Sequence, residues 1–458
     1  IPVSWLAYKQ LGNPMAPAVY GEQISKIAEL ETQLLDSAAE HQVVQAYLRR
    51  AKEMEARLQD VEGALERERE LGRERIRQLR AQNADVGLIV SASRELAALP
   101  RDVASARERW TREMHENYER AKPLGGLPPH SQAYAGDPDG TPEEQREYEL
   151  ARRNFLALMF CLMVGTAGLP HLLTRYYTSP TVAGARASVA WSLFFIALLY
   201  LSAPALAVLV KFEVMQNLVG SSFEALPNWM AQWARVDSSL LSIEDVNGDG
   251  IVQFGEIRLG ADLIMLATPE LGGLPYVVSG LVAAGGLAAA LSTADGLLLT
   301  ISNALVRDLY FRGTKRDASP EQRVILTKFT LLTVALSAAF VAALKPSEIL
   351  TMVSASFSLA ASAFVPVMVM GIFWRGTTRK GAVAGMLAGL GVAVYYLLSH
   401  VPAVRGALPG WLLADGLWFG IQPISAGVFG VPAGFVAAAV VSRITRPAPV
   451  PTGVRLEI

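Results

Sequence analysis

The feature that most constrains the fold of this chain is a series of apolar stretches that begins at about Asn154. Each stretch is roughly 20 residues long, the length that an α-helix needs to cross the hydrocarbon core of a bilayer. Charged residues are scarce in this part of the chain. We therefore predict an all-α membrane protein. The expected spans, about seven in number, are residues 154–173, 188–211, 275–300, 326–344, 347–373, 381–399 and 423–442.

The earlier part of the chain has a different composition. Residues 21–120 are crowded with Glu and Arg. Apolar residues at spacings of three and four between 24 and 79 predict one long amphipathic helix, half of a coiled coil or of a helical hairpin. A second helical stretch is expected over 93–118. Residues 121–150 are rich in Pro, Gly and Asp, which is typical of a linker.

These differences divide the chain into parts. The chain begins with Ile and not Met, so we expect residues 1–20 to be the end of a missing upstream membrane region or an outer loop. The arm and linker are followed by a transmembrane domain over 151–445 and a tail over 446–458. The net charge of −1 gives no indication of a nucleic-acid partner. The single cysteine, Cys161, excludes a structural disulfide.

The charges beside the spans predict the orientation of the chain. Lys and Arg in short loops are retained on the cytoplasmic side, and basic segments follow the first, third, fifth and last spans. If the spans alternate, these segments share one side, and the C-terminal tail lies in the cytoplasm. The arm and the segment between the second and third spans then lie on the outer face of a bacterial inner membrane.

The first span contains the sequence VGTAGLPHLLTRYY. Gly165, Gly168 and Pro170 should interrupt its helix, and irregular backbone at membrane depth is tolerated only where it is buried in protein or lines a wet cavity. In transporters such breaks present half-helix ends to substrate and ion. A proline kink with packing glycines is the alternative. His171 has no Ser or Cys nucleophile with a carboxylate around it, so we favour a histidine hydrogen-bonded inside the bundle over a catalytic one. The sequence contains no nucleotide-binding, metalloprotease or phosphotransfer motif, so we predict no enzyme activity.

The third span contains the sequence LAAALSTADGLLLTISNAL. Ala289, Ser292 and Thr293 share one helical face, so a carbonyl and two hydroxyls could converge on a small hard cation. Asp295 follows, and an ionisable residue in a spanning helix marks a pathway or a coupling ion by default. The alternative is that both hydroxyls bond back to their own helix or to a neighbour, with Asp295 wetted near the interface.

The segment DVNGDGIVQFGE, residues 245–256, matches the EF-hand calcium pattern D-x-[DN]-x-[DN]-G-x5-E in full. Gly250 allows the sharp turn, and Val252 is the apolar residue that pairs with a second loop in EF-hands, although no second loop is visible. An outer-face loop needs only an affinity of roughly 10⁻⁴ to 10⁻³ M. An Asx-rich turn without metal is the alternative. The expected ligands are Asp245, Asn247, Asp249, Gln253, Glu256 and the carbonyl of Ile251.

Three segments in the same order resemble the sodium/solute symporter family. The stretch VGTAGLPHLLTRYY is similar to its acetate-permease branch, and ALSTADGLLLTISNALVRDLY resembles its sodium-site helix. The stretch FWRGTTRKGAVAGMLAGL is similar to its Trp-x-Arg-x-Thr-x-x-Gly-Ala loop. The resemblance covers about residues 150 to 445. It does not reach the charged arm, which looks like an insertion.

The resemblance implies a sodium-coupled symporter of a small monocarboxylate such as acetate, with a LeuT-like core of ten helices in two inverted repeats. This chain would hold the second repeat and two trailing helices, and it would need its missing N-terminal half. The implied sodium ligands are Ala289, Ser292 and Thr293, with Asp295 a candidate for coupling. The implied cavity residues are Thr166, Gly168 and Pro170 in the first span and Ser354, Phe357 and Ser358 in the fifth.

Other functions stay open. The alternative from another class is a transporter-like membrane sensor that reports through the arm, but a short tail and an outer-face arm argue against it. A truncated, nonfunctional chain is a third reading. The arm is also a candidate for self-association. Calcium, if bound, would stabilise the structure of the outer gate region and would take no part in transport chemistry. The sequence does not distinguish among monocarboxylates or between sodium and proton coupling.

Overall fold

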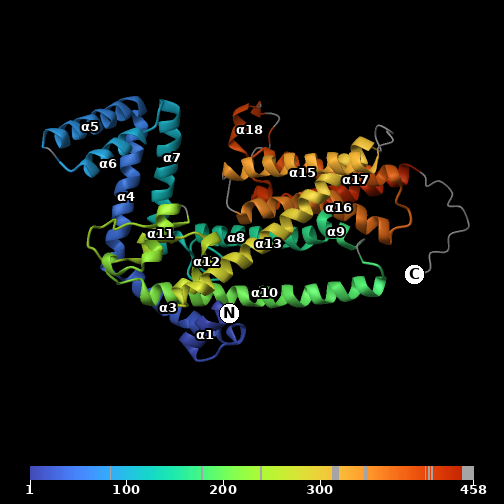
Figure 1. Ribbon diagram of the computed structural model, residues 1–458, viewed down its shortest axis with the longest axis horizontal. Helices are drawn as coiled ribbons and strands as arrows, with labels where there is room; N and C mark the ends of the chain where they lie inside the picture. The colour runs from blue at the N-terminus through green and yellow to red at the C-terminus, as the bar shows by residue number, and fades with distance from the viewer. Residues whose placement is uncertain are drawn as a thin grey trace, which may run out of the picture. The chain divides into compact units, whose positions relative to one another are not determined.

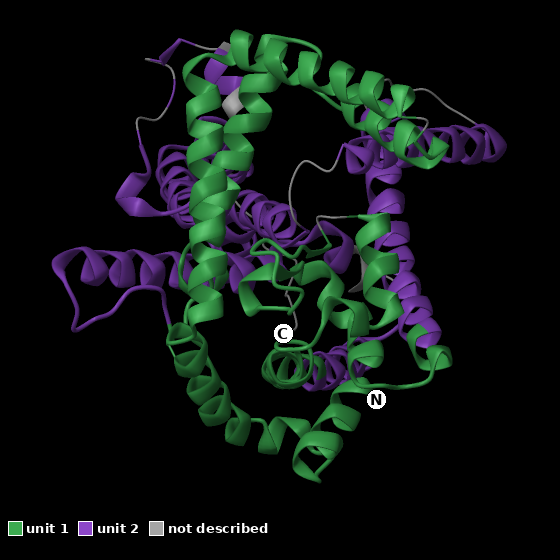
Figure 2. Cartoon of the chain, turned by 90° about the vertical axis from the view of Figure 1, so that its left-hand side faces the viewer, with its two compact units in different colours: residues 1–133, 199–279 green, residues 134–198, 280–458 purple. Residues whose placement is uncertain are grey.

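The computed structural model describes residues 1–82, 84–130, 132–176, 179–237, 240–311, 319–344, 349–407, 409, 410, 413 and 416–445. The predicted tail, 446–458, lies outside the described residues. Figure 1 labels many of the helices along the chain. The chain divides into two compact units, one of residues 1–133 with 199–279 and the other of residues 134–198 with 280–458 (Figure 2). Each unit is described by itself below.

Helices make up nearly all of the regular structure, which confirms the all-α prediction. A single two-stranded sheet in the first unit is the exception among the described residues. The first unit holds α1 (Pro2–Leu11), α2 (Ala16–Val19), α3 (Gly21–Leu35), α4 (Ala38–Gln59), α5 (Val61–Ala81), α6 (Val86–Ala97), α7 (Val103–Arg120), η1 (Pro123–Gly126), the end of α10 (Val182–Asn217), η2 (Phe223–Ala225), α11 (Asn228–Val236), β1 (Leu241–Ile243), η3 (Phe254–Glu256), β2 (Ile257–Leu259) and α12 (Ala261–Leu271).

The second unit holds the rest of the apolar helices. Its elements are α8 (Pro142–Gly168), α9 (Pro170–Tyr176), the start of α10, most of α13 (Tyr276–Asn303), the π-helix η4 (Ala304–Phe311), α15 (Pro320–Ala343), α16 (Ile349–Phe373), α17 (Arg379–Leu398), α18 (Pro402–Ala407), η6 (Trp418–Gly420), η7 (Pro423–Ser425) and α19 (Gly427–Ile444).

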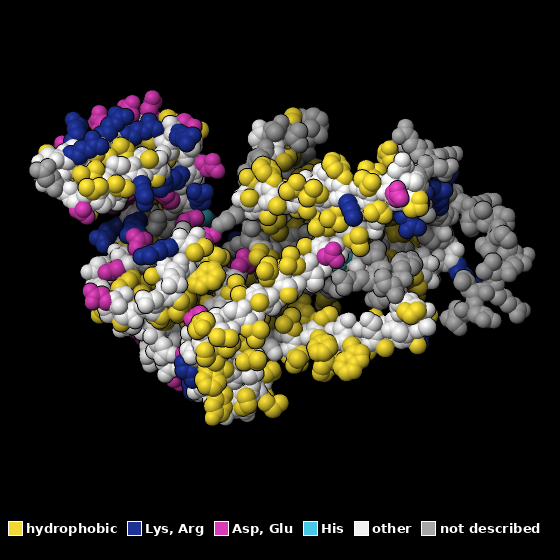
Figure 3. All heavy atoms as spheres, in the orientation of Figure 1, with side chains coloured by type: hydrophobic (Ala, Val, Ile, Leu, Met, Phe, Trp, Pro, Cys, Tyr) yellow, Lys and Arg dark blue, Asp and Glu magenta, His cyan; other side chains and the backbone are white. Residues whose placement is uncertain are grey.

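Seven of the described helical segments are long and apolar enough to cross a membrane, which confirms the predicted number. They are Pro142–Leu173, Val182–Asn217, Tyr276–Phe311, Pro320–Ala343, Ile349–Phe373, Arg379–Leu398 and Pro423–Ile444. The chain is therefore a multi-pass membrane protein. The apolar windows of α13 and α15 contain no buried residues, and yellow apolar side chains cover much of the visible surface of these helices (Figure 3).

The first span begins at Pro142, inside the stretch assigned to the linker. Thr141 caps this helix, because its hydroxyl accepts a hydrogen bond from the Glu144 amide and the Glu144 carboxylate accepts one from the Thr141 amide. This reciprocal pair is a capping box, and it starts a helix in a polar sequence. The helix then continues from polar into apolar residues without a break.

The arm is not one long helix over 24–79, so that prediction is wrong. The chain bends after Leu35, and again at Asp60, whose side chain accepts a hydrogen bond from the Gly63 amide and so starts α5. The second expected stretch, 93–118, is also two helices, α6 and α7. The arm consists of helix pairs, with α4 packed against α7 and α5 against α6, as in the helical-hairpin alternative.

The first unit ties α1 to the end of α10 through a buried carboxylate. Glu213 is only 3% exposed. Its carboxylate accepts hydrogen bonds from Lys9 Nζ at 2.5 Å, Gln10 Nε2 at 2.9 Å and Asn217 Nδ2 at 2.7 Å. A buried charge is tolerated only when it is paired and hydrogen-bonded, so this site fixes α1 on α10.

The second unit packs α17 against α16 and α19 through glycines. A Cβ atom added at Gly389 would lie 2.2 Å from the Ser362 carbonyl oxygen and 3.0 Å from the Gly430 carbonyl oxygen. Small residues let helix backbones approach closely, which is how helices associate in lipid. The three helices are therefore held by direct backbone contact.

We expect Gly389→Ala to destabilise the second unit, because its Cβ cannot fit without moving the Ser362 backbone. Overpacking typically costs about 1 to 3 kcal/mol. The matched control is Gly391→Ala in the same helix, where nothing lies within 4 Å of an added Cβ. Thermal unfolding of the purified protein in detergent measures both. An equal Tm for the two variants contradicts the packing described here.

Candidate functional site

The first span is broken where its sequence predicts. The helix α8 ends at Gly168, Leu169 is extended with φ −70° and ψ 117°, and α9 begins at Pro170. The break therefore separates two half-helices at one apolar segment. The prediction of an interrupted helix is confirmed.

The glycines before the break pack against α16. A Cβ at Gly165 would lie 2.6 Å from the Phe357 carbonyl oxygen, and one at Gly168 would lie 2.9 Å from the Ala360 carbonyl oxygen. The packing role that the sequence left as an alternative is thus present together with the break. Close approach at these points holds the broken helix against α16.

The predicted cavity residues lie on both sides of this contact. Ser354 and Ser358 are fully buried. Ser354 Oγ donates to the Leu350 carbonyl at 2.7 Å, and Ser358 Oγ donates to the Ile424 carbonyl at 2.5 Å. The structure places Phe357 and Ser358 beside α8. The hydroxyls of Ser354 and Ser358 both donate to carbonyls inside the helix bundle.

Thr166 is placed differently from the buried serines. Its side chain is exposed, and its hydroxyl donates to the Leu162 carbonyl at 2.7 Å in the same helix. Pro170 is half-buried at the start of α9. The assignment of these residues to a substrate cavity stays a prediction.

The predicted sodium ligands lie together on one turn of α13. Ser292 Oγ donates to the Ala289 carbonyl at 2.9 Å, and Thr293 Oγ1 donates to the same carbonyl at 3.1 Å. Both hydroxyls and Asp295 are exposed. Hard cations take more than three oxygen ligands, six to eight for Ca²⁺. A cation at this turn would therefore need further ligands from another helix.

The predicted calcium loop is closed by hydrogen bonds from its own backbone. Asp245 accepts from the amides of Gly248 at 2.7 Å and Gly250 at 3.0 Å, and Asp249 accepts from Ile251 at 2.8 Å. Gly250 has a φ of 74°, the left-handed turn that the pattern requires. The carboxylate, amide and carbonyl oxygens of this loop are the ligand types that calcium binds.

The acidic side chains of this loop do not converge on one point where they could coordinate an ion. Glu256 is fully buried. Its carboxylate accepts from the amides of Val246 at 2.7 Å and Gln253 at 3.1 Å. Across the described part of the chain, no three His, Cys, Asp or Glu side chains lie together as metal ligands. Binding calcium here would require the loop carboxylates to move toward one another.

The loop has a backbone partner that sequence reasoning missed. The Val252 amide donates to the Ser221 carbonyl at 2.8 Å, and the Gly220 amide donates to the Val252 carbonyl at 2.8 Å. Ile251 and Ser222 form an isolated antiparallel bridge. Residues 220–222 thus pair with the loop where a second calcium loop would pair in an EF-hand.

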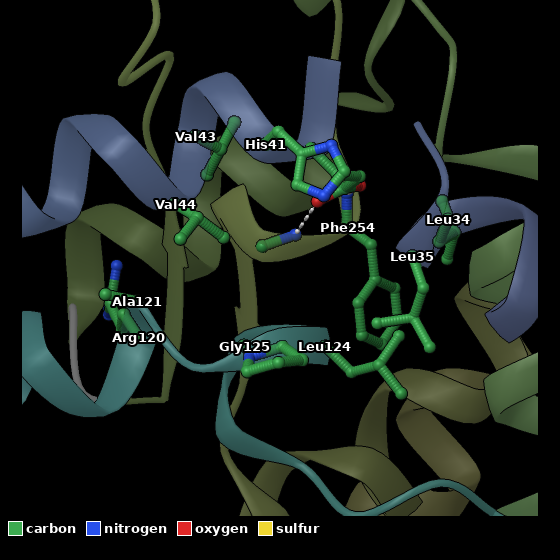
Figure 4. Close-up of a pocket in the computed structure, with 13 residues that line it drawn as sticks. Leu34, Leu35, His41, Val43, Val44, Arg120, Ala121, Leu124, Gly125 and Phe254 are labelled. Carbon is green, nitrogen blue, oxygen red and sulfur yellow. Dashed lines mark hydrogen bonds between the residues drawn. The ribbon is translucent and has the colours of Figure 1, made fainter. Parts of the chain in front are cut away.

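The arm holds the other side of the loop. The Glu40 carboxylate, at the start of α4, accepts hydrogen bonds from the amides of Phe254 and Gly255, the latter at 3.2 Å (Figure 4). A small cavity of about 120 Å³ lies beside this contact. It is lined mainly by apolar side chains, among them Leu34, Leu35, Val43, Val44, Leu124 and Phe254.

Burial affects the titration of the two glutamates at this junction. It raises the pKa of Glu256 and of Glu40 above the usual value for a glutamate, although backbone hydrogen bonds oppose the shift at both residues. No sequence signal identifies the Glu40 contact, because 214 residues separate Glu40 from Phe254.

Comparisons with known proteins identify the family of part of the chain. Residues 266–389 match the sequence model described as the sodium:solute symporter family. This segment contains α13, α15 and α16. The predicted family is confirmed for the segment.

Individual relatives are similar over different lengths. The chain is 48% identical over 452 residues to an uncharacterized symporter of Cupriavidus necator, covering 98% of this chain and 64% of the relative. It is 28% identical over 301 residues to a monocarboxylic acid transporter of Corynebacterium glutamicum, covering 64% of this chain and 47% of the relative. It is 33% identical over 129 residues to a high-affinity proline transporter of Bacillus subtilis, covering 28% of this chain and 27% of the relative.

These matches bear on two predictions. They support the prediction of a transporter, because residues 266–389 match a symporter family and the relative from Cupriavidus necator is named a symporter. An alignment of 452 residues must include most of the arm, so the arm is shared with the Cupriavidus relative. The chain spans 64% of that relative's length and about half or less of the other two. The expectation of a missing upstream half stays a prediction.

The raised pKa values predict a pH dependence of stability. A carboxyl with a higher pKa in the folded state holds its proton more tightly there, so folding is favoured at low pH and this contribution is lost as pH rises above about 4.5. We expect the thermal stability of the calcium-free protein to fall as the pH rises above about 4.5, the unfolded-state pKa of a glutamate. Glu256→Gln should flatten this slope, measured by thermal unfolding with chelator present. A slope unchanged in that variant excludes Glu256 as the source.

Proposed function

We propose that this chain is part of a sodium-coupled carrier of a small monocarboxylate that works by alternating access. The observation that carries the proposal is the family segment over residues 266–389, because it contains the α13 turn with its two hydroxyls. The broken span at α8 and α9 adds support, since interrupted helices serve as binding elements in carriers.

The relatives' names narrow the substrate class. One relative is named for monocarboxylic acids and another for proline, and both kinds of solute carry a carboxylate. The monocarboxylate relative aligns over 301 residues and the proline relative over 129. We therefore infer a small monocarboxylate, with acetate as the first compound to test.

In this proposal α13 binds the coupling ion. Ala289 contributes its carbonyl, and Ser292 and Thr293 contribute hydroxyl oxygens. These three oxygens already lie within one turn, and another helix supplies the remaining ligands. Asp295, exposed on the same helix, is the candidate for proton or sodium coupling.

The substrate binds beside the break in the first span. Thr166, Gly168 and Pro170 line it from α8 and α9, and Ser354, Phe357 and Ser358 line it from α16. Close packing of Gly165 and Gly168 against α16 supports this placement, because it keeps both sets of residues at one helix contact. The arm and the 245–256 loop lie on the outer face.

The loop binds calcium as a structural staple in this proposal. Asp245, Asn247, Asp249, Gln253 and Glu256 supply side-chain oxygens, and Ile251 supplies its carbonyl. The loop contacts the arm through Glu40 and the segment 220–222 through Val252. An ion bound there would hold three separate stretches of the first unit together.

We expect vesicles from cells that express the gene to accumulate radiolabelled acetate when sodium is higher outside. Ser292→Ala with Thr293→Ala should reduce uptake at least tenfold, a loss of about 1.4 kcal/mol in ion binding. Thr300→Ala, a hydroxyl elsewhere on α13 that donates to the Gly296 carbonyl, is the control. Pyruvate, lactate and proline compete with acetate if they share the site.

Several results would contradict this proposal. Uptake that persists without sodium, or that survives the double substitution, excludes the sodium site. Asp295→Asn with unchanged uptake and unchanged cation dependence excludes a coupling role for that residue. Folded protein that accumulates none of these acids favours the sensor.

We expect calcium to raise the Tm of the wild-type protein. At a calcium concentration about 100 times the dissociation constant, mass action adds about 2.7 kcal/mol of stability. Asp249→Ala with Glu256→Gln should remove this response, while magnesium at the same concentration should not reproduce it. A Tm insensitive to both calcium and chelator means that the loop is an Asx-rich turn without metal.

A further inference from the structure

The helix α5 exposes a stripe of four charges that have no partner. Glu66, Glu70, Arg73 and Arg77 follow one another at intervals of four, three and four residues, which places them on one face of the helix. All four are exposed. Within the described arm, none of them forms a hydrogen bond or an ion pair through its side chain.

Three other arginines of α5 contrast with this stripe. Arg67 pairs with Asp60 at 3.4 Å, Arg75 pairs with Glu95 at 3.1 Å, and Arg69 donates to the Pro100 carbonyl at 2.7 Å. These contacts hold the arm together. The stripe is therefore among the charges of α5 that the described arm does not use, as are Glu62, Glu74 and Arg80, which are also exposed.

The order of charges along the stripe is also unusual for an isolated helix. Two acidic residues, Glu66 and Glu70, are followed by two basic residues, Arg73 and Arg77. The two acidic residues are four positions apart, and so are the two basic residues. Like charges at this spacing destabilise an isolated helix. An opposing surface with the reverse order would neutralise all four charges at once.

A second copy of the same helix offers that reverse order. We infer that two copies of this chain associate through α5, side by side and antiparallel, about a two-fold axis that passes between Leu71 and Gly72. Glu66 of each copy then lies opposite Arg77 of the other, and Glu70 lies opposite Arg73. A two-fold interface uses the same patch on both subunits, and this stripe is complementary to itself.

The hairpin of α5 and α6 also exposes apolar side chains, but Leu71 lies about 130° around α5 from the stripe, so the four charges and not apolar burial carry the proposed interface. Leu71 is 67% exposed, Val86 is 72% exposed and Leu88 is 55% exposed. Figure 3 shows apolar side chains on this hairpin among basic and acidic ones. Because the stripe carries as many negative as positive charges, it suits a second copy better than an anionic lipid surface.

The test is the oligomeric state of the purified full chain in detergent, measured by light scattering after size exclusion. We expect the wild type to form dimers that weaken as salt rises. Glu66→Arg with Glu70→Arg makes the stripe wholly basic, and Arg73→Glu with Arg77→Glu makes it wholly acidic. Each double variant alone should be monomeric, with at least a tenfold higher dimer dissociation constant.

Two rescues separate pairing from misfolding. Mixing the basic and acidic variants should restore a dimer that contains one chain of each. The variant with all four substitutions carries the reversed order, which is again complementary to itself, and should dimerise alone. The control Glu108→Arg reverses an exposed charge on α7 and should leave the dimer unchanged.

The proposal is overturned if the wild type is monomeric, or if the double variants dimerise as it does. It is also overturned if the folded fourfold variant stays monomeric. These measurements use no transport assay, so they succeed or fail independently of the proposed function.

Discussion

Close backbone contact between helices is the constraint on which the second unit depends. Lipid tails are as apolar as the side chains that face them, so no hydrophobic effect drives helices together in a bilayer. The helices associate through van der Waals packing and hydrogen bonds instead. Gly389 supplies this contact between α17 and both neighbours, and Gly165 and Gly168 supply it between α8 and α16. The Cys161 thiol adds a hydrogen bond to the Ser425 carbonyl. The broken span is therefore held beside α16 by the same packing that holds the bundle.

The first unit is held together by carboxylates that are buried, at Glu213 and Glu31, or half-buried, at Glu40. Glu213 joins α1 to α10. Glu31 of α3 accepts from Lys211 Nζ and from the His130 amide, and Glu40 accepts from two amides at η3. Each carboxylate joins an element of the arm or the N-terminus to one far along the chain. Removing a cation or donor would leave a buried charge unpaired, which is strongly destabilising.

The sequence predicts those features that depend on local composition. Apolar windows identify all seven spans, and Gly168 with Pro170 identifies the break, because hydropathy and backbone freedom act within a few residues. The arm was predicted less well, since Asp60 ends one helix and caps the next inside an otherwise helical pattern. The contact of Glu40 with Phe254 and the pairing of Val252 with Ser221 join distant segments, and periodicity carries no information about such contacts.

The turn of α13 that we propose as a sodium site brings together local and long-range constraints. In α13 the two hydroxyls of Ser292 and Thr293 donate to the carbonyl of Ala289, so their protons are already bonded while their oxygen lone pairs stay free to face a cation. Local structure thus leaves the two hydroxyl oxygens free on one turn, whereas the Ala289 carbonyl, which accepts from both hydroxyls, would have to give up a hydrogen bond to bind a cation. The rest of a coordination shell must come from another helix. Ion binding and the docking of a neighbouring helix on α13 would then be one event. Such coupling is what alternating access requires, because the ion can stabilise a helix arrangement only through ligands that both helices provide.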